Sequence, residues 1–246
     1  FRFKKGTSFQ AMKSGVYYVA GIDSGSTSTD VVILDQNGKI KSTMIIPTGG
    51  GAMMSAEKSL AAAVEKAGIQ EEDIVRIVTT GYGRAYIDSG DDSITEITCH
   101  AKGAHYLNPN VRTIIDIGGQ DVKVLRVEDG VMTNFQMNDK CAAGTGRFLD
   151  VMARVLEVEV SDLGRLGAMS KKQVGISSTC TVFAESEVIS QLSMGTDKCD
   201  IIAGIHRSVA HRVTGLAHRI GVVPDVVMTG GVAQNQGVVD ALEAEL

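Results

Sequence analysis

The sequence predicts an α/β protein of two lobes, each built from a mixed sheet flanked by helices. Three observations support this prediction. Apolar runs of strand length alternate with segments of helical periodicity over 246 residues, of which 43% are hydrophobic, enough for two cores. A plan of strand, turn, strand and reversal occurs twice. Turns that contain glycine follow apolar runs at three places, and duplicated halves of this kind are typical of two packed α/β lobes.

The first lobe is predicted to span residues 16–110, after a polar segment, residues 1–15, that we interpret as a linker or a remnant of cloning. Residues 17–40 contain an apolar strand, an acidic glycine turn, a second strand and a reversal at Asn37-Gly38, which is typical of a tight hairpin. The rest of this lobe is predicted to hold helices over residues 52–67 and 97–106 and a short strand over residues 74–79.

The second lobe, residues 111–246, repeats the plan. A strand over residues 113–115 leads into a turn over residues 116–121, a strand over residues 122–127 and a reversal at Asp129-Gly130. The elements predicted after this hairpin are helices over residues 142–156, 182–193 and 201–220, a strand over residues 225–228, a turn over residues 229–231 and a last helix from Gln234.

The overall charge argues against several function classes. A net charge of −5 gives no basic surface for a nucleic-acid backbone, so we expect no nucleic-acid partner. No apolar run approaches the roughly 20 residues of a membrane helix, and the sequence indicates a soluble, cytoplasmic protein. In a reducing compartment the four cysteines are more often buried residues, ligands or redox centres than disulfides.

The glycine turns are candidate phosphate-binding sites. Glycine allows backbone N–H groups to converge on phosphate oxygens, and a carboxylate at the start of such a turn suits Mg²⁺ held between protein and nucleotide, through water. We therefore predict Mg²⁺ near Asp23 and Asp116, and an adenosine near the third turn. The predicted nucleotide-binding residues are Asp23, Ser24, Gly25, Ser26, Thr27, Gly118, Gly119, Gln120, Asp121, Gly230 and Gly231. Gln120 is the candidate for orienting water, and Asp116 for work as a base.

One such turn alone would indicate only a hairpin. Three in this order resemble the two phosphate motifs and the adenosine motif of the actin, sugar kinase and Hsp70 superfamily. That resemblance implies ribonuclease H-like duplicated domains with a nucleotide cleft between the lobes. A P-loop and a dinucleotide-binding Gly-x-Gly-x-x-Gly after the first strand are both missing from the sequence.

Two cysteines stand at predicted helix starts. Cys141 follows the capping residues Asn138 and Asp139, and Cys180 precedes a second helix, so that each sulfur would face the positive end of a helix dipole. A four-iron cluster needs four thiolates, and a two-fold dimer that shares one cluster would supply them. The alternative, that both are buried apolar thiols, stays open on these grounds; Cys99 and Cys199 are interpreted as packing residues.

Five stretches carry a resemblance to a known family. They are Thr80-Gly81-Tyr82-Gly83-Arg84, residues 116–121, residues 137–148 around Cys141, residues 177–188 around Cys180, and Gly204-Ile205-His206. These stretches closely resemble the activators of 2-hydroxyacyl-CoA dehydratases, a group that also includes ATPase subunits of benzoyl-CoA reductases. The resemblance runs from about Tyr17 to the end of the chain.

The resemblance implies an ATP-hydrolysing one-electron donor that activates a dehydratase. It implies a homodimer sharing one [4Fe-4S] cluster on Cys141 and Cys180 of each subunit, with ATP/ADP and Mg²⁺ as further cofactors and a ferredoxin or flavodoxin as reductant. Family chains continue through another strand and helix, so we expect the C-terminal end of the second lobe to be incomplete, or the chain to be one module of a longer protein.

Three other interpretations remain. An electron-donor component of a related reductase, such as benzoyl-CoA reductase, would share these motifs, whereas a small-molecule kinase of the sugar kinase type or a filament or chaperone-like ATPase would need no cysteine pair. His206, His211 and His218 recur along one predicted helix without matching ligands and are interpreted as surface or interface residues.

Overall fold

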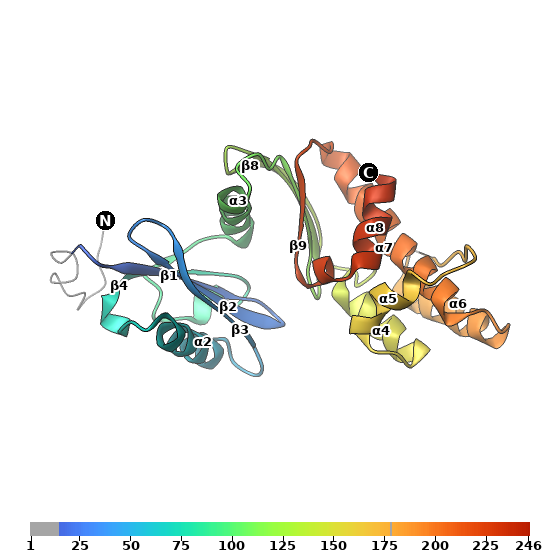
Figure 1. Ribbon diagram of the computed structural model, residues 1–246, viewed down its shortest axis with the longest axis horizontal. Coiled ribbons are helices and arrows are strands. Elements are labelled where there is room, and N and C mark those ends of the chain that lie inside the picture. Colours follow the sequence, from blue (N-terminus) through green and yellow to red (C-terminus); the bar gives the residue numbers. More distant parts are fainter. Residues whose placement is uncertain (1–14, 178) are drawn as a thin grey trace. The chain divides into compact units, whose positions relative to one another are not determined.

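The computed structural model describes residues 15–177 and 179–246, and the chain forms two compact units, Phe1–His100 and Ala101–Leu246 (Figure 1). Each unit has one sheet, as the repeat in the sequence predicts. Apart from Gly15, the segment interpreted as a linker lies outside the described residues. The predicted division after residue 110 stays a prediction.

The sheet of the first unit has the strand order β3-β2-β1-β4-β5. The first three strands are antiparallel, with the β2–β3 connection at the predicted Asn37-Gly38 reversal, and β4 and β5 add in parallel. The strands are β1 (Tyr18–Ser24), β2 (Ser28–Asp35), β3 (Ile40–Pro47), β4 (Ile74–Thr80) and β5 (Asp92–Ser93).

Helix α2 (Ala52–Ala67) packs on strands β1 to β3 and has the predicted bounds. Its buried residues face an apolar core that includes Ile22 and Ile33. Gly68 ends the helix in the left-handed conformation, with φ 67°, and Ser42 Oγ donates a 2.7 Å hydrogen bond to the Ala63 carbonyl. Short 3-10 turns, η1 (Glu71–Asp73) and η2 (Arg84–Tyr86), flank β4.

The sheet of the second unit repeats this arrangement in the order β8-β7-β6-β9, with three antiparallel strands and β9 parallel to β6. Asp129 and Gly130 have φ 50° and 72° in the β7–β8 reversal, as expected for a tight hairpin turn. The strands are β6 (Thr113–Ile117), β7 (Val122–Glu128), β8 (Val131–Asn138) and β9 (Val226–Thr229).

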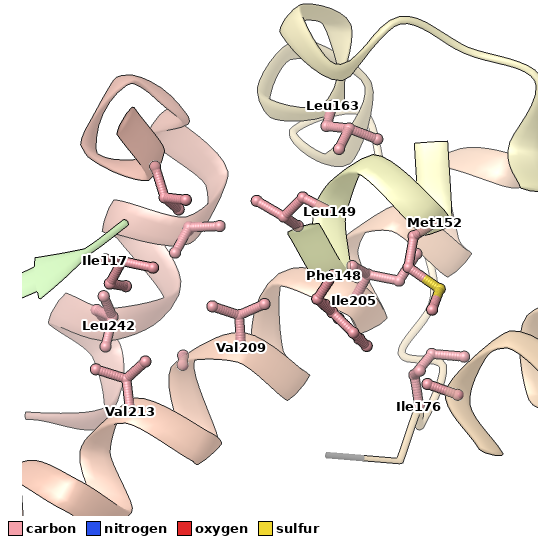
Figure 2. Packing of buried hydrophobic residues seen from close by; sticks show 14 of the residues in the cluster. Ile117, Phe148, Leu149, Met152, Leu163, Ile176, Ile205, Val209, Val213 and Leu242 are labelled. Atoms are coloured by element: carbon pink, nitrogen blue, oxygen red, sulfur yellow. The ribbon is translucent and has the colours of Figure 1, made fainter. Parts of the chain in front are cut away.

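Helices form the rest of the second unit, with the long helix α7 at their centre. Helix α7 packs against α5, α8 and strands β7 and β8. Figure 2 shows Val209 and Val213 of α7 pointing toward Ile117 and Leu242, while Phe148 lies beside Ile205. The helices are α3 (Glu96–Leu107), which crosses the unit boundary, α4 (Gly146–Leu156), α5 (Leu163–Gly167), α6 (Thr181–Ser193), α7 (Lys198–Ile220) and α8 (Gln236–Glu245), with 3-10 turns η3 (Val160–Asp162) and η4 (Gly231–Gln234).

The predicted α/β class with two mixed sheets is confirmed, and several details of the prediction were wrong. Helix α4 begins at Gly146, four residues later than predicted, and the short helix α5 was not predicted. Asp23 and Asp116 lie inside strands β1 and β6, not in the turns that follow. Within the described residues no helix combines the length and apolar character needed to cross a membrane.

Candidate functional site

The first glycine turn follows a row of three residues on neighbouring strands of the first unit. Asp23 on β1 pairs with Asp30 on β2 and with Thr80 on β4, so the three side chains lie on one face of the sheet. We call Asp30, Asp23 and Thr80 the first row. Burial raises the pKa of the Asp30 carboxyl, and the hydroxyl of Ser28 partly opposes this shift.

The turn itself presents its tip to solvent. Gly25 N–H donates a 2.9 Å bond to the Ser28 carbonyl, and the side chains of Ser26 and Thr27 are exposed. Ser24 differs from the prediction, because its side chain is 0% exposed and lies beneath the segment after β4. Ser26 and Thr27 therefore remain candidates for contact with phosphate, whereas Ser24 would act from behind the turn.

The segment that covers Ser24 is Gly81–Gly83. Gly81 has φ 82°, and a side chain there would collide with Asp23 Oδ1. Gly83 N–H donates a 2.9 Å bond to the Ser24 carbonyl. Ser24 Oγ and Thr80 Oγ1 are buried beside this segment and have no hydrogen-bond partner among the described residues. The two hydroxyls are thus left available for a bound ligand or its water.

A second row lies at the same position in the second unit. Asp116 on β6 pairs with Lys123 on β7 and with Thr229 on β9, and we call these three residues the second row. Thr229 Oγ1 donates a 3.0 Å hydrogen bond to Asp116 Oδ1. The buried Lys123 Nζ lies 2.7 Å from Asp121 Oδ2 and 3.7 Å from Asp116 Oδ2. The carboxylate of Asp116 is therefore held from two sides.

The second glycine turn joins this row to helix α4. Gly118 N–H donates a 3.0 Å bond to the Asp121 carbonyl, which closes the turn, and Gly119 and Gln120 are exposed at its tip. The carbonyls of Gly118 and Gly119 accept bonds of 2.9 and 2.8 Å from the N–H groups of Gly146 and Arg147. The first amides of α4 are thus satisfied by the backbone of the turn.

The third glycine turn follows β9. Gly230 has φ 85°, and a side chain there would collide with the Ile117 carbonyl and lie 2.9 Å from Asp116 Oδ1. The strand leads first into η4 and only then into α8, where Asn235 Oδ1 accepts a 3.3 Å bond from Val238 N–H. Gly231 has open space around its Cα, which suits the approach of a flat ligand such as adenosine.

Each row ends on a Thr-Gly pair in the same geometry. Thr80-Gly81 ends β4 and Thr229-Gly230 ends β9, and both glycines have positive φ and lie against the aspartate of their row. The sequence contained this signal as two Thr-Gly pairs after apolar runs, but it gave no partner for either threonine. Asp30 and Lys123 were missed as well, although each stands seven residues after its aspartate.

The rows fit a magnesium-bound nucleotide in different ways. Mg²⁺ prefers oxygen ligands, keeps several waters and usually binds through few carboxylates together with substrate phosphates. Asp23 and Asp30, beside two buried hydroxyls, offer such oxygens, whereas Asp116 already faces the ammonium of Lys123. In the described part of the chain no three histidine, cysteine or acidic residues gather as a metal site.

The two candidate cluster ligands lie in the second unit with different backbone settings. Cys180 is the N-cap residue of α6, as predicted. Cys141 lies in a loop before α4, whose N-cap is Thr145, so the prediction that Cys141 opens a helix was wrong. Asn138 Nδ2 holds this loop by a 2.9 Å bond to the Cys141 carbonyl, and so the capping residue that misled the prediction supports the loop instead.

Both candidate thiols are accessible to solvent. Cys141 and Cys180 are partly exposed and form no disulfide. Glu187 Oε2 accepts a 2.6 Å bond from Ser177 N–H and thereby anchors the segment before Cys180. Val182 and Phe183, just after Cys180, are 65% and 63% exposed, so apolar side chains stand at the surface next to this cysteine.

The remaining cysteines and histidines show less sign of function. Cys99 and Cys199 are partly exposed on α3 and α7, so they are not the fully buried residues expected of packing thiols. Burial and Asp197 raise the pKa of the Cys199 thiol, which lowers its reactivity. His206 is buried, contrary to the prediction of a surface residue, while His211 and His218 are exposed.

Comparison with known proteins gives close relatives over nearly the whole chain. The (R)-2-hydroxyglutaryl-CoA dehydratase activating ATPase of Acidaminococcus fermentans is 61% identical over 230 residues, which cover 93% of this chain and 88% of that protein. A component of the benzoyl-CoA reductase of Thauera aromatica is 33% identical over 193 residues, 78% of this chain and 68% of that component.

Solved structures agree. The crystal structure of component A of the Acidaminococcus fermentans (R)-2-hydroxyglutaryl-CoA dehydratase, 60% identical, superposes with a TM-score of 0.90 over 93% of this chain and 88% of its own. The activator of the 2-hydroxyisocaproyl-CoA dehydratase from Clostridium difficile, solved with bound ADPNP, is 52% identical and gives 0.86 over 93% and 85%.

A more distant structure supports the fold class alone. A ROK family glucokinase from Streptomyces griseus, in complex with glucose and AMPPNP, is 14% identical and gives a TM-score of 0.52 over 92% of this chain and 88% of its own. The predicted fold of the actin, sugar kinase and Hsp70 type is thus confirmed. The model of the BadF/BadG/BcrA/BcrD ATPase family matches residues 20–246, and the chain belongs to that family.

Proposed function

We propose that this protein hydrolyses ATP and uses the free energy to donate single electrons to a 2-hydroxyacyl-CoA dehydratase. The observation that carries the proposal is the occurrence, in one chain, of two matched aspartate and Thr-Gly rows and of two partly exposed cysteines, of which Cys180 begins a helix with exposed apolar residues. The 61% identity to a dehydratase-activating ATPase supports the choice of acceptor. Such chemistry belongs in a reducing cytoplasm.

The glycine turns would bind the nucleotide. In this proposal the amides and hydroxyls of Ser26 and Thr27 and the amide of Gly119 take the phosphates. Gly25 and Gly118 close the two turns, and Gly230 and Gly231 pass against the adenosine. Asp23 would take Mg²⁺ through water. When bound, the ion offsets charge on the phosphates.

Hydrolysis would take place at the second row. Gln120 is exposed at the tip of its turn and is proposed to orient the attacking water. Asp116 is fixed by Thr229 and is proposed to accept the proton of that water, either directly or through Gln120-bound solvent. The sequence-based assignments of both residues are retained, with the carboxylate now placed inside β6.

The cysteines would hold an iron-sulfur cluster shared by two copies of the chain. Cys141 and Cys180 supply two thiolates, so a [4Fe-4S] cluster requires the same pair from a second subunit. The cluster supplies the one-electron redox chemistry. The exposed Val182 and Phe183 on α6 suit the interface of the homodimer that this sharing needs.

A backbone connection supports coupling between the two sites. Gly118 and Gly119, in the second glycine turn, accept hydrogen bonds from the first residues of α4, and the loop with Cys141 leads directly into that helix. Displacement of the turn by phosphate would therefore act on the Cys141 loop. This gives ATP turnover a route to the electron donor within one unit.

Anaerobic purification tests the proposal. Iron and sulfide should each amount to about four per dimer, the expected content of a [4Fe-4S] cluster, and dithionite should bleach the visible absorption. A reduced ferredoxin or flavodoxin should reduce the oxidised cluster in place of dithionite. A protein that stays colourless and free of iron after anaerobic reconstitution would disprove the electron-donor function. A kinase or a structural ATPase of this fold would then remain, and phosphoryl transfer to sugars would be assayed.

The cysteine assignments predict a selective loss. Cys141→Ser and Cys180→Ser should each lose the cluster absorption while ADP affinity changes by less than about threefold, because the glycine turns lie on other segments. Cys99→Ser is the matched control and should retain a normal iron content. Normal iron in either ligand variant, measured on the purified dimer, would disprove the assignment.

The acceptor can be identified separately. Activation of a 2-hydroxyacyl-CoA dehydratase should require this protein, ATP and reductant together. Reduction of an aromatic acyl-CoA in place of dehydration would favour the alternative that the 33% identical benzoyl-CoA reductase component suggests.

A further inference from the structure

The two rows are alike at two positions and opposite in charge at the third. Each has an aspartate on its first strand and a threonine before a positive-φ glycine. On the neighbouring antiparallel strand, Asp23 faces Asp30, whereas Asp116 faces Lys123. The duplicated scaffold therefore places a second carboxylate beside one aspartate and an ammonium beside the other.

Lys123 is buried to a degree that is rare for lysine. It is 2% exposed, and its Nζ contacts Asp121 Oδ2 at 2.7 Å and lies 3.7 Å from Asp116 Oδ2. A buried ammonium is costly unless carboxylates surround it. An apolar residue at this position of β7 would avoid that cost, so we look for a function of the charge.

The contacts around Asp116 define that purpose. Thr229 Oγ1 holds Oδ1 at 3.0 Å, and Lys123 faces Oδ2 from the opposite strand. Asp121 in turn fixes the ammonium. The turn packs closely on Asp121, because a side chain at Gly118 would place its Cβ only 2.9 Å from Asp121 Oδ1. The carboxylate of Asp116 is thus oriented by one neutral donor and one cation.

The first row has a different character. Asp23 and Asp30 stand opposite each other on β1 and β2. The buried atoms Asp30 Oδ1, Ser24 Oγ and Thr80 Oγ1 have no hydrogen-bond partner among the described residues. Buried oxygens of this kind are satisfied by a cation or by the water that it carries.

We propose that Lys123 is a positioning residue that fixes Asp116 and offsets its charge, so that the nucleotide's divalent cation is drawn to the first row instead. The inference rests on the proposed nucleotide function. It assigns the two aspartates different duties, although the sequence alone gave both of them to magnesium.

Binding of Mn²⁺, followed by electron paramagnetic resonance in the presence of saturating ADP, tests the inference. Lys123→Met removes the positive charge beside Asp116, so Mn²⁺ should bind roughly tenfold more tightly, or at an additional site, because the carboxylate becomes available. Lys123→Arg should restore the wild-type affinity. Lys102→Met, at an exposed position of α3, is the matched control and should change nothing.

Turnover should respond in the opposite direction. Loss of a fixed orientation at Asp116 should lower kcat by about 10- to 100-fold while KM for ATP changes little. A role confined to stability predicts lower expression or a lower Tm, without tighter binding of Mn²⁺. In Asp116→Asn/Lys123→Met the gain in Mn²⁺ affinity should disappear.

Lys123→Met could unfold the protein by leaving Asp121 buried and unpaired. Asp121→Asn/Lys123→Met removes the pair as a unit and leaves Asp116 without its cation, so it should show the same tighter binding of Mn²⁺. Unchanged or weaker binding in folded variants overturns the role of Lys123. Wild-type protein that binds no ADP would instead overturn the proposed function.

Discussion

His206 is a histidine built into the core of the second unit. It is 3% exposed on α7, and its ring lies against Gly167 of α5 and Gly237 of α8, where a Cβ would collide with it. Burial lowers the pKa of its imidazole to about 4, and Arg207 adds to the shift while Asp240 opposes it. The neutral form is therefore the form that the fold accepts.

This residue predicts an acid-sensitive stability. Because the folded pKa, about 4, lies below the unfolded value of 6.5, the unfolded chain binds more protons between these values. The free energy of unfolding is unaffected by this group above pH 6.5. It decreases by roughly 3 kcal/mol in total as the pH drops from 6.5 to 4. Urea unfolding between pH 4 and 7 would measure it.

Two variants separate this contribution from that of other groups. His206→Gln should flatten the pH dependence of the free energy of unfolding, whatever its effect at neutral pH. His218→Gln, at an exposed position of the same helix, should leave the slope as in wild type. An equal slope in wild type and His206→Gln would assign the acid sensitivity elsewhere.

The burial of His206 could not be predicted from the sequence. Its helix has apolar residues at helical spacing, which predicted α7 well, but the two glycines that make room for the ring come from α5 and α8. Lys123 was missed for a similar reason. Its position opposite Asp116 depends on the register of β6 and β7 and not on spacing along the chain.

At the level of elements, β4 and β9 end in the same backbone geometry. Gly81 and Gly230 both turn the chain with positive φ directly over the aspartate of their row. Only glycine combines that conformation with so close an approach. The threonine before each glycine stays in the sheet, so strand end and carboxylate are fixed together.

Alanine at either glycine should therefore be harmful. Gly81→Ala and Gly230→Ala should each lower the free energy of unfolding by at least about 1–2 kcal/mol, because alanine disfavours positive φ and its Cβ would displace the aspartate. ADP affinity, measured by calorimetry, should fall as well. Gly103→Ala is the control, since its Cβ meets nothing within 4 Å and should stabilise α3.

Local patterns predicted most elements and failed where distant backbone atoms decide. Helix α2 and the two hairpins follow from periodicity and from Asn-Gly and Asp-Gly pairs. The start of α4 was predicted too early because Asn138 and Asp139 look like caps, whereas the first amides of that helix bond to the second glycine turn, far earlier in the chain. Capping by another segment leaves no local signal.

At the scale of the molecule, the exposed apolar residues of α6 suit the interface of the proposed dimer. Val182, Phe183 and Ile189 are each at least half exposed, near Cys180. The proposed dimer would cover them and would bring a second pair of thiols to the cluster.

A charge on this face should separate the proposed dimer. Phe183→Glu should reduce the mass measured by light scattering to that of one chain, and the iron content should fall with it, since two cysteines cannot complete the cluster. Leu107→Glu places the same charge on an exposed leucine at the end of α3 and should leave mass and iron unchanged. A dimer with full iron in Phe183→Glu would move the interface elsewhere.

The bonds from Gly146 and Arg147 to the carbonyls of Gly118 and Gly119 have a consequence for how this protein can evolve. They join the second glycine turn to the helix after the Cys141 loop through main-chain atoms alone. Among single replacements only proline at residue 146 or 147 removes a donor of this link. Insertion or deletion would also break it, whereas substitutions that keep the backbone N–H groups leave its donors in place.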